Sequence, residues 1–173
     1  IYHHGEVFRG AAGIAGEIGH TSIDVNGELC ECGNRGCLTA YVSTLTLQEK
    51  ANAALKKVGK VPCADFDEVV VRIKAHEEEV YAEFRKMMQY LSTGIINLIY
   101  SYNPSLIILG DEMSRIGSLM IHEIKNCWSS LVQRKVVDQA ELCLTSFDMD
   151  PAFIGSAEVA IDYVFGHTEL LRN

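Results

Sequence analysis

The sequence from Cys30 to Cys37 reads CECGNRGC, and the rest of the chain is organised around this stretch. Three thiols fall within eight residues, and Gly33 and Gly36 stand where the chain must fold back sharply to aim the sulfurs at one point. Ten residues before Cys30, His20 ends the motif Gly-Glu-Ile-Gly-His. Thiolate and imidazole are donors that zinc takes readily. We therefore predict a closed, tetrahedral structural zinc site whose ligands are His20, Cys30, Cys32 and Cys37.

Inert buried thiols and a disulfide bridge are the alternatives to a metal site at these cysteines. Buried cysteines have no reason to alternate with Glu31, Asn34 and Arg35 in a polar, glycine-punctuated loop. The tight Cys-x-Cys spacing followed by a second turn also suits a metal knuckle better than a bridge. The sequence thus favours zinc here, whereas ordinary core positions are expected for the cysteines in apolar or helical contexts, Cys63, Cys127 and Cys143.

The composition limits the classes of function. The chain has 173 residues, of which 48% are hydrophobic and 22% charged, as in a soluble globular protein with one core. Its net charge of −8 argues against binding nucleic acid by itself, so any DNA-binding part is expected elsewhere. No apolar run approaches the ~20 residues that span a bilayer, and no charged-then-apolar leader opens the chain. With reduced cysteines in a metal loop, we expect a cytoplasmic protein without a membrane partner.

Residues 1–10 are expected to form the return half of a hairpin, with the turn at Gly5-Glu6 and a strand at 7–9. No outgoing strand is evident before this turn, and the chain has no initiator methionine. We therefore expect a piece of a longer protein.

The chain divides into three segments, of which the first two are a loop region and a helical region. Residues 10–43 hold a glycine-rich loop that matches neither the Rossmann nor the Walker pattern, a short strand at 21–25, and the cysteine stretch. Residues 44–103 are predicted to be helical: apolar residues recur at helical spacing from Leu38 to about Val58, again after Asp65 or Asp67, and most strongly from Val80 to Ile99.

Residues 104–173 alternate between strands and helices. Strands are predicted at 105–110 and 141–145, a helix capped by Ser114 follows the first, and a last helix opens at Asp150-Pro151. Helix, strand, helix, strand, helix is the order of an α/β domain with helices packed on a sheet.

Three motifs in this order resemble the ROK family of bacterial sugar kinases and sugar-responsive transcriptional repressors: Gly16–His20, Cys30–Leu38 and Asn103–Gly110. The resemblance extends from Gly10 to the last helix. It implies an α/β, actin-like or ribonuclease-H-like ATPase fold of two lobes. Residues 1–173 would be a single second lobe with a small zinc-binding loop, and the N-terminal lobe would be absent.

The resemblance also implies roles for single residues. His20 and the three loop cysteines would hold the zinc, and Glu17 and His20 would face the hydroxyls of a sugar. A carboxylate can accept two hydroxyl protons, and a bound metal fixes the imidazole's orientation. Thr39 stands where the family usually has a sugar-binding glutamate, so one anchor is missing. Gly110 would lie on the adenosine side of the cleft, where residues 111–112 are acidic and would repel a nucleotide.

In the family, the catalytic aspartate and the first phosphate-binding motif belong to the first lobe. We therefore expect no catalytic residue in this chain, because phosphoryl transfer needs both halves of the cleft. The leading hypothesis is the effector domain of a ROK-type regulator that binds a sugar or sugar phosphate, reaches DNA only through an upstream helix-turn-helix, and forms a homo-oligomer.

Two alternatives remain. One is a fragment of an ATP-dependent sugar kinase such as a glucokinase, which would use ATP and magnesium. The other is a member that binds no sugar and serves only in assembly.

Overall fold

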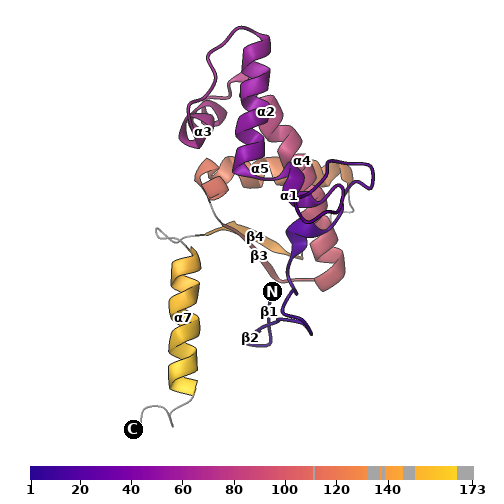
Figure 1. Cartoon of the computed structure of the whole chain (residues 1–173), viewed down its shortest axis with the longest axis vertical. Helices are drawn as coiled ribbons and strands as arrows, with labels where there is room; N and C mark the ends of the chain where they lie inside the picture. The colour runs from indigo at the N-terminus through magenta and orange to yellow at the C-terminus, as the bar shows by residue number, and fades with distance from the viewer. Residues whose placement is uncertain (111, 132–136, 138, 146–150, 167–173) are drawn as a thin grey trace.

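A computed structural model describes the chain except for residues 111, 132–136, 138, 146–150 and 167–173 (Figure 1). The described part is mixed α/β. Its elements in chain order are β1 (Tyr2–His3), β2 (Glu6–Val7), a 3-10 helix (Ile18–His20), α1 (Leu38–Tyr41), α2 (Thr44–Lys57), α3 (Phe66–Lys74), α4 (Glu78–Tyr102), β3 (Leu106–Leu109), a second 3-10 helix (Glu112–Ile116), α5 (Ser118–Leu131), β4 (Glu141–Leu144) and α7 (Pro151–Gly166).

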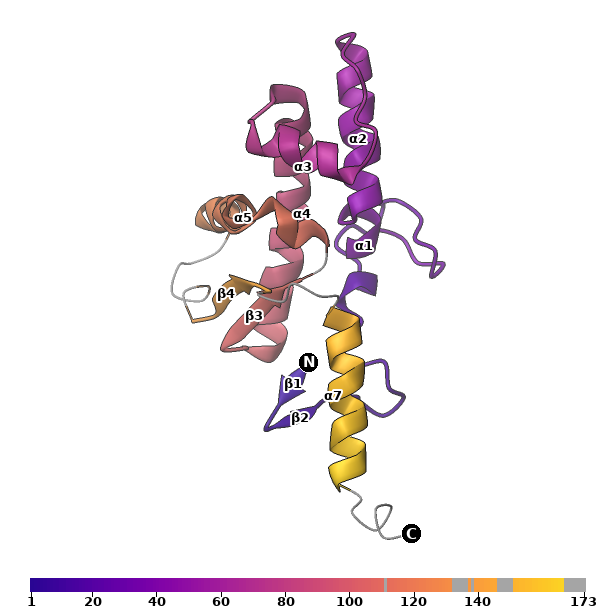
Figure 2. The same ribbon diagram turned by 90° about the vertical axis from the view of Figure 1, so that its left-hand side faces the viewer.

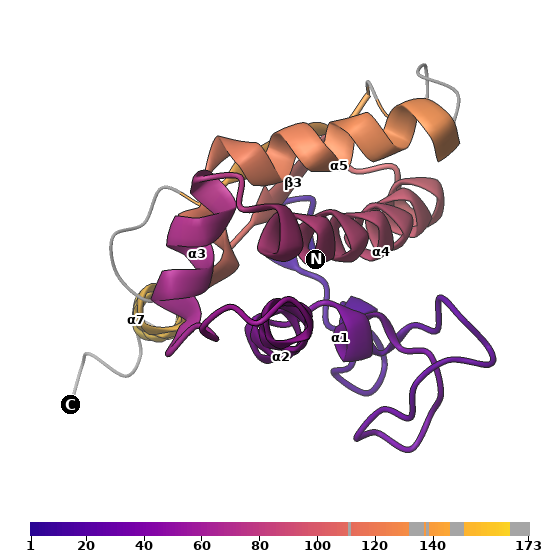
Figure 3. The same ribbon diagram turned by 90° about the horizontal axis from the view of Figure 1, so that it is seen from above.

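The central element is α4, which contacts α2, α3 and α5 and lies between α5 and α2 in Figure 3. Acidic Glu78 and Glu79 occupy its first turn, where they favour the helix dipole. Its apolar stripe, which includes the fully buried Phe84 and Met88, forms much of the core. Asn103 ends the helix in the left-handed conformation, at φ 43°, just before a proline that cannot continue it. The strong helical periodicity predicted for this segment is confirmed.

Two pairs of strands complete the described structure. Parallel β3 and β4 pair from Leu106 with Glu141 to Leu109 with Leu144, which confirms the predicted pair of strands. Ile107 and Leu142 on these strands belong to the core formed with the helices. Figure 1 shows α7 standing apart from the other helices and from the β1–β2 hairpin, which lies next to it only in the projection of Figure 2. Among the described residues, no helix is both long and apolar enough to cross a membrane.

The structure corrects several details of the predicted elements. The apolar period from Leu38 is interrupted, because Ser43 has an extended backbone and its side chain accepts a hydrogen bond from the Thr46 N–H to begin α2. Residues 21–25 form only an isolated bridge, between Ser22 and Cys37. A side-chain cap is present at Asp65, which accepts from the Glu68 N–H to begin α3.

Two further expectations concern the ends of elements. Tyr2 pairs with Val7, so β1 is the outgoing strand of the first hairpin, and the expectation that no such strand precedes the turn is wrong. Ser114 lies within a 3-10 helix instead of capping α5, which begins after Gly117 at φ +80°. The errors at the hairpin and at Ser114 both arise where only one or two residues decide the local conformation.

Candidate metal centre

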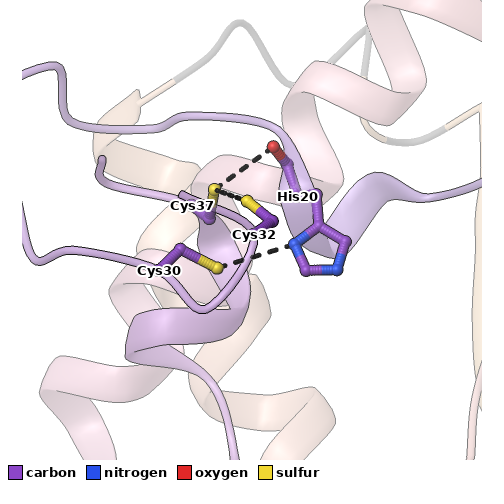
Figure 4. A group of neighbouring side chains, drawn as sticks. All are labelled: His20, Cys30, Cys32 and Cys37. Atoms are coloured by element: carbon purple, nitrogen blue, oxygen red, sulfur yellow. Dashed lines mark hydrogen bonds between the residues drawn. The ribbon is translucent and has the colours of Figure 1, made fainter. Parts of the chain in front are cut away.

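The structure brings His20, Cys30, Cys32 and Cys37 together, with their ligand atoms all within 4.8 Å of one another (Figure 4). Nδ1 of His20 lies 3.6 Å from Sγ of Cys30, and Sγ of Cys32 lies 3.6 Å from Sγ of Cys37. Four donors at tetrahedral corners around zinc, with zinc–sulfur bonds of about 2.3 Å, are separated by about 3.8 Å. The donor set and its spacing therefore fit a tetrahedral metal ion such as zinc.

Turn geometry in the loop explains how three cysteines meet. The Gly33 N–H donates to the Cys30 carbonyl at 2.9 Å, and the Cys30 N–H donates to the Asn34 carbonyl at 2.8 Å. Gly36 adopts φ +66°, and a Cβ built on it would overlap the backbone oxygen of Asp24. Gly33 also has a positive φ, +86°, but faces open space. The predicted need for glycine at the second turn is thus steric as well as conformational.

The other two donors come from the elements that flank the loop. His20 is the last residue of the first 3-10 helix, and fully buried Cys37 directly precedes α1. The Leu38 N–H donates to the Thr21 carbonyl at 3.0 Å, which holds the start of α1 next to the end of the 3-10 helix. Cys37 as a thiol donates to the His20 carbonyl at 3.3 Å. The imidazole of His20 and the sulfur of Cys37 therefore come together because the two chain segments pair side by side, as the antiparallel bridge between Ser22 and Cys37 also shows.

The electrostatics of the thiols differ across the cluster. A hydrogen bond from the Asn34 backbone lowers the pKa of Cys32 to about 7, whereas burial raises the pKa of Cys37 to about 11. With a pKa of about 7, roughly half of Cys32 is thiolate at neutral pH. Cys37 needs a strong positive charge nearby to ionise, and a bound metal ion supplies such a charge.

Two of the predicted ligand-binding residues, Glu17 and Thr39, lie on the elements beside this cluster. Thr39 packs against Gly19, since a Cβ built on Gly19 would lie 3.5 Å from the Cβ of Thr39. Glu17 is exposed, and its carbonyl accepts a hydrogen bond from the His20 N–H at 3.1 Å. Gly110 belongs to another part of the fold: it directly follows β3, and a Cβ built on it would meet nothing within 4 Å. The expectation for the acidic residue at position 111 falls outside the described residues.

A cavity of about 750 Å³ adjoins the cluster between the metal loop, α1, the start of α2 and the middle of α4. It includes Cys30 and Thr39 but neither Glu17 nor His20. Tyr41 and Tyr90 also line it, and neither was predicted from the sequence to belong to a site. The sequence does contain a signal for Tyr41: it is an aromatic residue only four positions after Cys37, close enough to pack beside the loop.

Comparison with known proteins gives a consistent picture. The family model described as "ROK family" matches residues 1–163. The xylose repressor of Bacillus spizizenii is 27% identical over 157 residues, which cover 91% of this chain and 39% of the repressor. A putative xylose repressor of Caldicellulosiruptor sp. is 33% identical over 134 residues, 69% of this chain and 32% of that protein. The glucokinase of Thermotoga maritima is 23% identical over 175 residues, 96% of this chain and 55% of the enzyme. The chain thus spans less than two thirds of each of these relatives.

Solved structures show the same fold. A ROK family transcriptional regulator, a homologue of the E. coli MLC protein, aligns with a TM-score of 0.71 at 23% identity, over 83% of this chain and 37% of that one. A ROK family glucokinase from Streptomyces griseus, in complex with glucose and AMPPNP, aligns with a TM-score of 0.72 at 22% identity, over 81% of this chain and 49% of that one. These neighbours imply an actin-like sugar-kinase fold, and this chain aligns with less than half of each of the two.

Proposed function

Because this chain belongs to the ROK family, whose model covers residues 1–163, we propose that it is the sugar-sensing effector domain of a ROK-type transcriptional regulator. It forms the second lobe of the actin-like fold and is stabilised by a structural zinc ion. The observation that carries the proposal is the cluster of His20 with three cysteines, because its flanking elements carry the two predicted sugar-binding residues: Glu17 directly precedes the first 3-10 helix, and Thr39 lies on α1. Such a cluster can fix a binding surface without taking part in chemistry.

In this proposal the zinc has a structural and not a catalytic role. His20 and the three cysteines would hold the ion, whose positive charge would stabilise the thiolates and so keep the loop closed. His20 turns Nδ1 toward the sulfurs, so Nε2 is left for a hydroxyl of the sugar. Glu17 accepts hydrogen bonds from sugar hydroxyls, and Thr39 offers a single hydroxyl where a carboxylate would accept two.

A sugar or sugar phosphate then acts as the effector. Binding stabilises one arrangement of this domain, and the resulting shift in conformational equilibrium alters the grip of an N-terminal helix-turn-helix on DNA. The net charge of −8 on this domain disfavours contacts with the phosphates of DNA, so the proposal assigns DNA binding to the helix-turn-helix. A homo-oligomer would pair two such DNA-binding units on a two-fold site. Xylose repressors among the relatives support this assignment.

A sugar kinase is the second candidate, supported by the match to a glucokinase. In that case ATP and magnesium would bind on the side of Gly110, and the first lobe would supply the catalytic base. The acidic residue Glu112 close to Gly110 favours the regulator, because its charge repels a triphosphate, whereas Thr39 weakens sugar binding in either class.

One experiment on the full-length protein separates the two. Fluorescence anisotropy with operator DNA, with and without D-xylose or D-glucose, should show at least a fivefold change in DNA affinity, which corresponds to the usual coupling of about 1 kcal/mol. A parallel assay for ADP should show no sugar-dependent turnover. Sugar phosphorylation without DNA binding would overturn the regulator in favour of the kinase. The sequence before Ile1 gives an independent check, since a helix-turn-helix or an Asp-x-Gly phosphate loop would identify the class.

A further inference from the structure

Helix α1 is a single turn between the metal loop and α4, and a helix this short has little stability of its own. Tertiary contacts at its two ends must therefore hold it in place. Leu38, at the start of α1, fits against Gly94 of α4 so closely that a Cβ built on Gly94 would overlap the leucine side chain. Tyr41, at the end of α1, makes a second set of contacts on the same side of α4.

The hydroxyl of Tyr41 contacts the backbone of residues 27–28, which lead into the loop just before its first cysteine, Cys30. It accepts a hydrogen bond from the Glu28 N–H at 2.9 Å. A Cβ built on Gly27 would overlap the same oxygen, so the backbone passes directly against it. The next ligand in the chain, Cys30, follows only two residues after Glu28. The phenol thus fixes the position at which the chain enters the metal site.

The ring of Tyr41 contacts α4. It stacks on Tyr90 with ring centroids 4.4 Å apart and an angle of 24° between the planes. Tyr90 and Gly94 are four residues apart, so they lie one above the other on a single face of α4. That face therefore receives both ends of α1, and Tyr41 connects it to the loop.

We propose that Tyr41 is a positioning residue that fastens the metal-binding loop, residues 28–37, to α4. The inference rests on the proposed structural zinc for its effect on metal affinity, but the contacts themselves do not depend on the metal. By holding the backbone at Glu28, Tyr41 pre-orders the loop and lowers the entropy cost of gathering the four ligands. Because Thr39 lies between Leu38 and Tyr41 on α1, the same contacts orient the residue next to the proposed sugar site.

The test compares Tyr41→Phe, which keeps the stacked ring, with Tyr41→Leu, which loses both ring and hydroxyl. Tyr100→Phe is the matched control, since Tyr100 lies on α4 but is 64% exposed. Zinc affinity is measured by competition with a chromophoric chelator. We expect three- to tenfold weaker zinc binding for Tyr41→Phe, the loss expected for one net hydrogen bond, a greater loss for Tyr41→Leu, and no change for Tyr100→Phe.

Hydrogen exchange of the loop amides in metal-free protein is the second readout. Exchange from residues 28–37 should be faster in Tyr41→Phe than in the wild type, while the core of α4 is unchanged. Unchanged zinc affinity together with unchanged loop exchange would overturn the proposal, as would an equal loss of protection throughout the chain. If the wild type binds no zinc, the zinc part of the proposed function fails, whereas the exchange comparison still decides whether Tyr41 positions the loop.

Discussion

Replacing Gly36 with alanine should disrupt the metal site far more than replacing Gly33, although both glycines lie in the same loop. Both have a positive φ, +66° at Gly36 and +86° at Gly33, so an alanine at either site bears the strain of a left-handed backbone, about 1–2 kcal/mol. Only at Gly36 does the new methyl group meet an obstacle, the backbone oxygen of Asp24. The comparison therefore isolates the steric requirement from the conformational one.

The magnitude follows from the hydrogen bonds that must yield. To relieve the overlap, Gly36 and the Asp24 turn must separate. This weakens the bond from the Ile23 N–H to the Gly36 carbonyl and the bond from the Gly36 N–H to the Glu28 carbonyl, each 2.8 Å long. At about 1 kcal/mol each, their loss adds about 2 kcal/mol, or roughly a 30-fold difference in zinc affinity between the two variants.

Competition with a chelator gives the two affinities, and circular dichroism shows whether the helical core survives. We expect Gly36→Ala to bind zinc about 30-fold more weakly than Gly33→Ala, with both variants keeping the helical signal of α2, α4 and α5. Equal zinc affinities in the two variants would refute the argument that contact with Asp24 decides the loop's conformation.

The remaining predictions concern the ligand site, the packing of α1 and the response to acid. Thr39→Glu should raise the affinity for D-glucose or D-xylose about tenfold by adding a charged acceptor, and calorimetry that finds no gain would place Thr39 outside the sugar site. Gly94→Ala should lower the free energy of unfolding by about 1 kcal/mol in urea titrations, because overlap with Leu38 outweighs the gain in helix propensity. Gly155→Ala is the control and should cause no such loss, because nothing lies within 4 Å of its new Cβ. The same loss of stability in both variants would refute the packing argument. The Ala64 N–H and then Arg72 lower the pKa of Glu68 below its ordinary 4.5, so its contribution is present above that pH and lost as the pH falls. Glu68→Gln should therefore lose less stability than the wild type between pH 5 and 3, and parallel curves would count against this role.

Patterns that repeat over many residues could be read from the sequence, and single-residue decisions could not. The stripe of α4 was predictable because more than six turns agree on one buried face. The break between α1 and α2 was not, since it depends on Ser43 adopting an extended backbone and capping the next helix. The short strand predicted after Thr21 reduces to one bridge because the chain there pairs with the cysteine loop and not with a neighbouring strand.

The metal cluster was predictable for a chemical reason. Closely spaced cysteines can aim their sulfurs at one point only if the loop turns sharply, and the glycines between them permit such turns; the structure places His20 beside these sulfurs. Tyr41 and Gly94 were missed because their roles arise from contacts across the fold. Tyr41 resembled any apolar residue of a helix, and a glycine inside α4 gave no sign that Leu38 would pack against it.

The central claim is that this domain is built around a structural zinc ion. Elemental analysis of protein purified without chelators and without added metal tests it most directly. The account predicts about one zinc ion per chain, retained on dialysis and lost when Cys37, buried in the cluster, is replaced by serine. Protein that is folded and free of zinc, with the same stability as protein loaded with the metal, would contradict it.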